Sequence, residues 1–162
     1  LPALDWGREL LSESDFDFVR SFRPTYELDL TPALSLLCFH GSPRSNTAML
    51  LSPTAHETVV GFFPGQSAMI LAGGHTHIQM LRQRGGRVLL NPGSVGNAFL
   101  EPFLPGGETP TLLPWAEYAL VRVGKGGWSA DLRRVGFDMR AVQRAAAAGG
   151  NPSKEWWLAQ YR

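Results

Sequence analysis

Residues 68–77 read Ala-Met-Ile-Leu-Ala-Gly-Gly-His-Thr-His, and this stretch decides the fold. Its first half, Ala68–Ala72, is a continuous apolar run, which is typical of a strand buried on both faces of a sheet. Gly73-Gly74 ends the run, because glycine lets the backbone turn sharply and keeps side-chain bulk away from a ligand. The stretch therefore predicts a buried strand that delivers His75 and His77 to its end.

Two other apolar runs end in the same way. Ala33–Phe39 leads into His40-Gly41-Ser42, and Arg87–Leu90 leads into Asn91-Pro92-Gly93-Ser94. In open sheets, ligand sites gather just beyond strand ends of this kind. We therefore expect the three polar segments to form a common rim of histidines and backbone turns.

The histidines of this rim suit a metal site. In an extended chain, residues i and i+2 point to the same side, about 6.6 Å apart at Cα, so His75 and His77 can converge on one metal. They can also serve two metals that lie about 3.5–4 Å apart. The alternative is a pair of surface histidines, but His40 after a buried strand favours ligation. We leave His56 out of the site, because it falls on a predicted exposed helix face.

Three segments carry a family resemblance. Gly74-His75-Thr76-His77 is similar to the GHTH motif of calcineurin-like metallophosphoesterases, and His40-Gly41-Ser42-Pro43-Arg44 resembles the HGSPR segment of their bacterial phosphodiesterase-like branch. Asn91-Pro92-Gly93-Ser94-Val95-Gly96 resembles the NPGSVG turn that follows in that branch. Order and spacing agree, and Arg134-Val135-Gly136-Phe137-Asp138 also looks like the branch, so the resemblance covers nearly the whole chain.

The resemblance implies a fold and an activity. The implied fold class is α/β, a four-layer α/β/β/α sandwich of two sheets with helices outside. The implied function is a metal-dependent phosphodiesterase or phosphatase, in which a hydroxide between two divalent ions attacks phosphorus in line. His40 and His75 match ligands of the second metal, and His77 matches a ligand of the first. Manganese is the first choice of metal, with iron, zinc and nickel as alternatives.

Three motifs of the family pattern are absent from the sequence. These are an Asp-x-His segment, a Gly-Asp and a Gly-Asn-His, which supply two aspartate ligands, an asparagine ligand and the general-acid histidine. Asp15 and Asp17 lie in a helical stretch without a preceding apolar strand, and Asp5 and Asp29 have no better setting. No residue is therefore assigned as the general acid.

We interpret residues 1–162 as a single domain, the carboxyl-terminal portion of a metallophosphoesterase domain that lacks the first strands and motifs. The sequence begins at Leu1 rather than at methionine. We expect a separate amino-terminal piece or a second copy of the chain to cover the uncompleted sheet. Failing these, we expect an exposed sheet edge near Ala33–Phe39 and Ala68–Ala72.

Substrate contacts are assigned to two side chains of the rim. Arg44 offers a bidentate fork for a phosphate group, although an exposed loop arginine is the alternative. Asn97 is the second candidate, and the sequence leaves Gln79 open. Ser42 and Ser94 lack the Gly-x-Ser-x-Gly context of a nucleophile, so we interpret them as turn residues.

The remaining elements follow from periodicity and turn residues. The predictions are a helix over residues 3–23, a strand Tyr26–Leu30, a helix Thr54–Phe62 with Thr54 as its N-cap, a strand Ile78–Gln83, a hairpin of Glu117–Val123 and Ser129–Val135, a helix capped by Asp138 that runs to Ala148, and a short helix capped by residues 151–153.

The composition narrows the choice of partners. A net charge of +1 is too balanced to suggest a nucleic acid or an anionic membrane, and no apolar run approaches the length of a membrane span. Cys38 is the single cysteine, which fits a reducing compartment and favours the cytoplasm. The family resemblance implies small phosphoesters or nucleotides as the substrates.

Three hypotheses about function remain. The first is the metal-dependent phosphoesterase. The second is a catalytically silent fragment or interaction module that keeps a histidine cluster, because the aspartate motifs are absent. The third, ranked last, is an α/β domain with incidental histidines. The metal content of the chain distinguishes the first from the other two.

Overall fold

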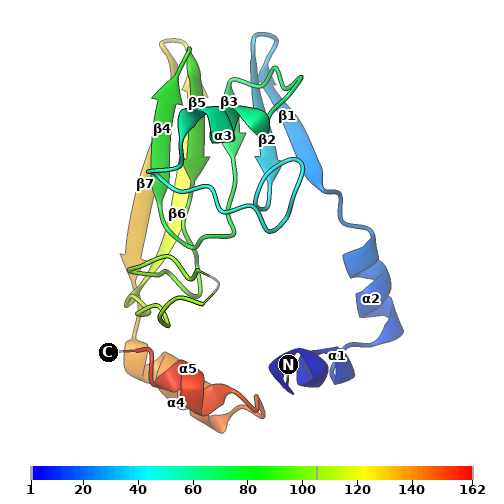
Figure 1. The fold of residues 1–162 in the computed structure, drawn as a ribbon, viewed down its shortest axis with the longest axis vertical. Coiled ribbons are helices and arrows are strands. Elements are labelled where there is room, and N and C mark those ends of the chain that lie inside the picture. Colours follow the sequence, from blue (N-terminus) through cyan, green and yellow to red (C-terminus); the bar gives the residue numbers. More distant parts are fainter. Residues whose placement is uncertain (1, 105, 162) are drawn as a thin grey trace.

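The computed structural model describes residues 2–104 and 106–161 (Figure 1). Five helices and seven strands occur in these residues. In chain order they are α1 (Pro2–Glu9), α2 (Glu13–Arg20), β1 (Thr25–Thr31), β2 (Leu34–Phe39), α3 (His56–Gly61), β3 (Ile70–Ala72), β4 (Met80–Arg84), β5 (Arg87–Asn91), β6 (Trp115–Gly124), β7 (Gly127–Gly136), α4 (Met139–Ala148) and α5 (Lys154–Leu158).

The larger sheet has five strands in the order β1-β2-β3-β5-β4. The three central strands, β2, β3 and β5, run parallel, while β1 and β4 pair antiparallel at the two edges. The carboxyl ends of the parallel strands therefore meet at one end of the sheet. The expected open edge near Ala33–Phe39 and Ala68–Ala72 is wrong, because β1 covers β2, and β3 lies between β2 and β5.

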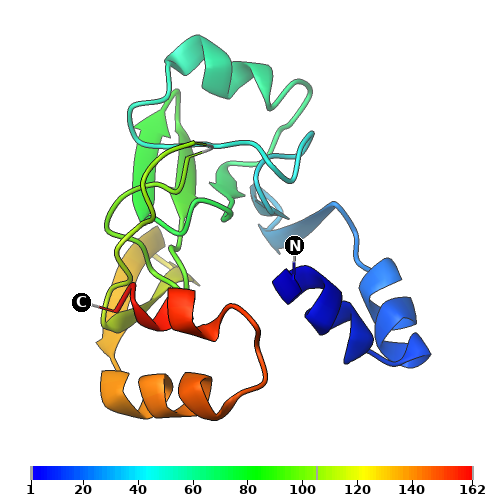
Figure 2. The same ribbon diagram turned by 60° about the horizontal axis from the view of Figure 1, so that its bottom comes forward.

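Alternating side chains divide the core between the two faces of this sheet. One face carries Leu37, Leu71 and Leu89, which pack with Phe63 and with Val59 of α3. The other face carries Ile70, Val88 and Leu90, which pack against Ala119, Val121, Trp128 and Ala130 of the hairpin β6-β7. Figures 1 and 2 show α3 on one side of the sheet and the hairpin on the other. The predicted α/β class is confirmed, with helix, sheet and sheet as successive layers.

The hairpin forms a second sheet of two strands. The strands pair from Trp115 and Gly136 to Gly124 and Gly127. Gly127 adopts a φ of +118°, which glycine reaches without steric cost. The predicted hairpin is confirmed, and both strands extend beyond the predicted ends.

The amino-terminal region contains two helices rather than the single predicted helix over residues 3–23. Ser12 interrupts it with an extended backbone and begins α2 as its N-cap. Its hydroxyl accepts from the N–H of Asp15, and the carboxylate of Asp15 accepts from the N–H of Ser12. This reciprocal capping box starts a new helix. Neither helix lies against the sheets in Figures 1 and 2.

The other helix ends agree only in part with the predictions. Thr54 is not the N-cap of α3, because the cap is Ala55 and the Thr54 hydroxyl accepts from the N–H of Leu51. Asp138 does cap α4, since its carboxylate accepts from the N–H of Ala141. No helix in the described part of the chain is long and apolar enough to cross a membrane.

Candidate metal centre

The parallel strands bring the histidine segments together. β2 and β3 pair up to Cys38 and Ala72, so His40 and Gly73-Gly74 leave the sheet side by side. The N–H of Gly74 donates to the carbonyl of His40 at 2.6 Å, which joins the two segments directly after the strands end. The expected rim of histidines and turns is therefore present.

The backbone at His75 and His77 differs from the extended conformation that we expected. Both residues are left-handed, with φ of +67° and +57°. Histidine is among the residues that tolerate this region best. Thr76, between them, is buried, and its hydroxyl accepts from Asn91 Nδ2 at 2.9 Å. The two imidazoles therefore depend on a tight turn for their placement, rather than on strand alternation.

His40 and His75 meet across the rim. His75 Nδ1 lies 3.2 Å from His40 Nε2, and the ring centroids are 5.0 Å apart. Partial burial, followed by the nearby imidazoles of His40 and His77, lowers the pKa of His75 below its ordinary value. This lowered pKa favours the neutral imidazole, which is the form of histidine that binds a metal.

His77 is oriented by a neighbouring backbone group. Its Nδ1 lies 2.8 Å from the carbonyl oxygen of Asn97, and its ring stacks on Phe99 with centroids 4.7 Å apart. A histidine that donates Nδ1–H to a carbonyl keeps Nε2 free as a ligand. The carbonyl of Asn97 thus fixes the ring of His77, a role that the sequence did not indicate.

The predicted substrate residues belong to the loops that follow β2 and β5. Arg44 is exposed in the loop after His40, and the substrate roles of Arg44 and Asn97 stay predictions. Ser42 is buried, and its hydroxyl accepts from the N–H of Ser45 at 3.0 Å. The hydroxyl of Ser94 accepts from the N–H of Asn97. The interpretation of both serines as turn residues is confirmed.

Asn91 joins two of the three segments from inside. Its side-chain amide donates to the carbonyl of Gly74 at 2.8 Å and to the hydroxyl of Thr76, while its Oδ1 accepts from the N–H of Gly93. Only 2% of Asn91 is exposed. A buried amide that satisfies three polar groups holds a single loop geometry. The sequence indicated only a turn here, although an asparagine closing an apolar strand was a usable signal.

Glu117 is a buried carboxylate that the sequence analysis missed. Its Oε1 accepts from Trp115 Nε1 at 3.0 Å and from Arg134 Nε at 2.9 Å. Its Oε2 has no hydrogen-bond partner among the described residues and faces Gly93. A Cβ at Gly93 would lie 2.0 Å from this oxygen, so the close approach requires glycine. The signal, a charged residue within an alternating strand, is too common to have singled it out.

His40 Nε2 and His75 Nδ1 lie at hydrogen-bonding distance, which is also the spacing of two ligands on one metal ion. Two imidazole nitrogens bound to a tetrahedral zinc at about 2.0–2.1 Å lie about 3.3 Å apart, close to the 3.2 Å between these two atoms. Within residues 2–104 and 106–161, however, no group of three or more His, Cys, Asp or Glu side chains is arranged to hold a metal ion. The described residues thus fit part of a metal site and not a complete ligand set for two ions.

Only the comparison with solved structures bears on the fold. No protein-family profile matches the sequence, and no curated protein matches it. Among solved structures, the chain is similar to a metallophosphoesterase from Sphaerobacter thermophilus, with a TM-score of 0.65 and 19% identity over 96% of this chain and 66% of that one. A hypothetical protein from Pyrococcus horikoshii gives a TM-score of 0.69 and 12% identity over 94% of this chain and 56% of that one.

A weaker likeness links the chain to Vps29 from Entamoeba histolytica, which was solved in complex with Zn²⁺. The TM-score is 0.47, with 18% identity over 80% of this chain and 78% of that one. The chain spans less than two thirds of the Sphaerobacter protein and just over half of the Pyrococcus protein. Because 96% of this chain aligns with the Sphaerobacter structure, the chain has the fold of the matching part of that metallophosphoesterase.

Proposed function

We propose that this chain supplies the histidine side of a dinuclear metal centre in a metal-dependent phosphodiesterase or phosphatase. The observation that carries the proposal is the 3.2 Å approach of His40 Nε2 and His75 Nδ1 at the common end of three parallel strands. The metallophosphoesterase fold supports it. The three rim segments alone would not, because turns with histidines occur in many folds.

Each histidine has a defined part in the proposal. His40 and His75 hold one ion, and His77 holds the other through Nε2, with Nδ1 on the carbonyl of Asn97. When bound, two divalent ions neutralise the charge of phosphate oxygens and lower the pKa of a coordinated water. Arg44 orients the phosphate through its guanidinium, and the side chain of Asn97 is the second proposed substrate contact.

The supporting residues keep this geometry before any ligand arrives. Asn91 holds the turn that carries His75 and His77, and Phe99 packs against the ring of His77. A metal ligand whose ring is fixed in advance loses less conformational entropy on binding. Weakening such an outer contact typically costs about 10–100-fold in metal affinity or activity.

The proposal includes ligands from outside residues 1–162. The carboxylates would come from coding sequence upstream of Leu1 or from a separate amino-terminal piece, and a homo-oligomer is the other candidate assembly. Manganese is the first metal to test, followed by iron, zinc and nickel. The proposed substrate is a small phosphoester or nucleotide, and the proposed location is the cytoplasm.

A second candidate function rests on the absence of a complete ligand set in the described residues. A chain with this fold and three histidines can serve as a catalytically silent interaction module. It would bind one metal ion weakly or none, and its histidines would be retained for the turn that they form.

Metal titration separates the two candidates. The chain is titrated with Mn²⁺ and Zn²⁺ in a calorimeter, beside His75→Asn, His77→Asn and the control His56→Asn. Asparagine also tolerates a left-handed backbone, so the turn is kept. With the upstream coding sequence present, the enzyme proposal expects two ions per chain, and both site variants should weaken this binding by about tenfold or more while the control leaves it unchanged. The silent module expects one weakly bound ion or none.

An activity assay then tests the chemistry. The chain is expressed with its upstream coding sequence and assayed on bis(p-nitrophenyl) phosphate and p-nitrophenyl phosphate with each metal. Hydrolysis that is lost in His75→Asn supports the enzyme. Full metal occupancy without hydrolysis of either ester would leave the silent module as the better account.

A further inference from the structure

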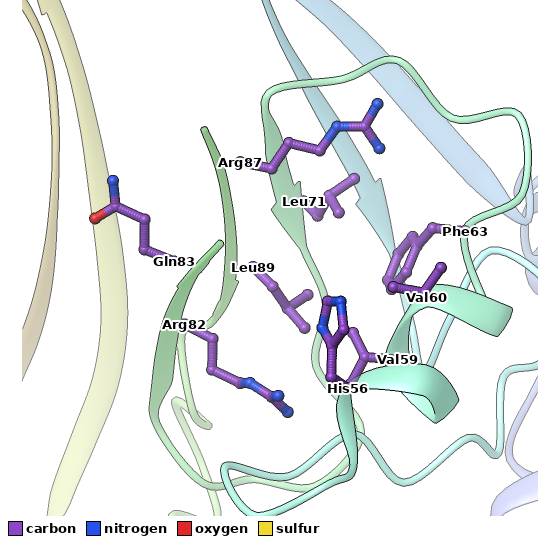
Figure 3. A pocket seen from close by; sticks show the side chains of 9 residues that line it. All are labelled: His56, Val59, Val60, Phe63, Leu71, Arg82, Gln83, Arg87 and Leu89. Carbon is purple, nitrogen blue, oxygen red and sulfur yellow. The ribbon is translucent and has the colours of Figure 1, made fainter. Parts of the chain in front are cut away.

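A cavity of about 280 Å³ lies between α3 and the sheet, on the face opposite the hairpin (Figure 3). Its floor is apolar and is formed by Phe63, Leu71 and Leu89. Three basic side chains, His56, Arg82 and Arg87, stand around it. None of these residues belongs to the rim of histidines at the strand ends.

Local geometry explains why this side of the sheet combines apolar and basic side chains. On β5, Arg87 and Leu89 are two residues apart and therefore point to the same face. His56, Val59, Val60 and Phe63 recur at helical spacing along and just after α3, so they share the side that faces the sheet. The cavity follows because the short helix α3 covers only part of this face.

The basic groups differ in what they already bind. Arg82 donates through Nη1 to the carbonyls of Leu51 and Thr54 at 3.3 and 2.8 Å, so its guanidinium is fixed by the chain itself. In the described part of the chain, neither the guanidinium of Arg87 nor the imidazole of His56 has a hydrogen bond or ion pair. No aspartate or glutamate lines the cavity. Positive charge without a counter-ion therefore borders an apolar floor.

We propose that this cavity binds a small organic anion with an apolar body. The anionic head lies against Arg87, and the body lies on Leu71, Leu89 and Phe63. Arginine suits carboxylate and phosphate heads equally, because both accept its planar fork. The cavity is just below the usual range of about 300–1,000 Å³ for ligand pockets, which favours a small ligand over a nucleotide. The proposal is independent of the metal centre.

A fluorescence titration with 8-anilinonaphthalene-1-sulfonate tests the charge preference. The dye carries one sulfonate on an aromatic body, and N-phenyl-1-naphthylamine is its neutral counterpart. We expect one dye site whose Kd rises about tenfold in Arg87→Gln and stays unchanged in Arg140→Gln, an exposed arginine of α4. Equal binding of the neutral dye, or equal effects of the two arginine variants, would overturn the proposal.

A second variant guards against loss of folding as the explanation. Val60→Glu places a carboxylate beside the cavity at a position that is already 55% exposed. The variant should bind the anionic dye more weakly and the neutral dye as before, and its circular dichroism spectrum should be unchanged. Weakening of both dyes with intact circular dichroism would contradict an anion site.

Competition identifies the source of the anion. Decanoate is a flexible carboxylate, and 1-naphthyl phosphate is an aromatic phosphate. Displacement of the dye by decanoate assigns the cavity to chain carboxylates, and displacement by 1-naphthyl phosphate assigns it to aryl phosphates. Displacement by neither would mean an adventitious dye site only and would remove the assignment.

Discussion

The histidine rim and the amino-terminal helices are held in opposite ways. At the rim, the buried amide of Asn91 and the N–H of Gly74 join segments that are far apart in the sequence. In α2, no residue is buried, and the helix relies on the local capping box at Ser12. The rim therefore shares the stability of the whole sheet, whereas α1 and α2 should open independently. The difference teaches that a preformed site here depends on long-range polar contacts more than on local sequence.

The largest effect should come from Gly93→Ala. The new Cβ would lie 2.0 Å from Glu117 Oε2 and 2.7 Å from Glu117 Cβ, and the position has a φ of +84°. Overpacking and backbone strain together should lower the free energy of unfolding by about 3–5 kcal/mol. Urea denaturation measures this change in the free energy of unfolding.

Gly96→Ala is the matched control in the same loop. Nothing lies within 4 Å of a Cβ at Gly96. The free energy of unfolding should therefore change by no more than about 0.5 kcal/mol in this variant. Equal destabilisation by the two substitutions would mean that the loop tolerates no side chain anywhere. The close approach of Glu117 would then not be the cause.

The next effect should come from Asn91→Ala. This change leaves the carbonyl of Gly74, the hydroxyl of Thr76 and the N–H of Gly93 without their partner. Unsatisfied buried groups cost about 1–3 kcal/mol each, with relaxation reducing the sum, so we expect a loss of about 2–4 kcal/mol. Asn46→Ala, at an exposed site, should be near neutral by the same urea denaturation, and comparable losses would refute the role of Asn91.

Ser12→Ala tests whether the amino-terminal helix α2 opens independently of the sheet. Losing an N-cap costs a helix about 1 kcal/mol, but α2 packs against no core. Hydrogen exchange should therefore speed up for the amides of α2, while the free energy of global unfolding stays constant. A parallel fall in global stability would show that α2 belongs to the cooperative unit.

The smallest effect concerns the hairpin and pH. A hydrogen bond from Arg122, helped by the charge of Arg133, holds the pKa of Asp131 below its ordinary value. A lowered folded-state pKa contributes stability that is full above the ordinary aspartate pKa and is lost as the pH falls through the lowered one. In Asp131→Asn, the free energy of unfolding should therefore fall less as the pH is lowered. Thermal unfolding from pH 6 to pH 2 measures this pH dependence. The same pH dependence in the variant and in the unchanged protein would contradict the role of Asp131.

The sequence predicted the strands of this fold well, because their apolar runs and glycine-rich ends are local signals. β2, β3 and β5, the hairpin and the Asp138 cap all lie where these signals put them. The split between α1 and α2 was missed, because the single serine cap at Ser12 competes with a periodicity that runs through it. The pairing of β1 with β2 was missed as well, although the two-residue connection between Thr31 and Leu34 is a local hairpin signal.

For the candidate site, the sequence identified residues but not their geometry. The three histidines lie on one rim, as expected, yet the turn that places His75 and His77 is left-handed. That conformation depends on Thr76 and Asn91, whose hydrogen bonds join separate segments. Glu117 was not predicted for the same reason, because its partners Arg134 and Gly93 come from distant parts of the chain.

The left-handed backbone at His75 and His77 also restricts how this rim can change over evolutionary time. Most residues strain such a position, whereas asparagine and aspartate tolerate it. Both are one base change away from a histidine codon. His75→Asp would therefore introduce a charged carboxylate ligand at the rim without rebuilding the turn, whereas His75→Asn would leave only a weakly binding neutral amide.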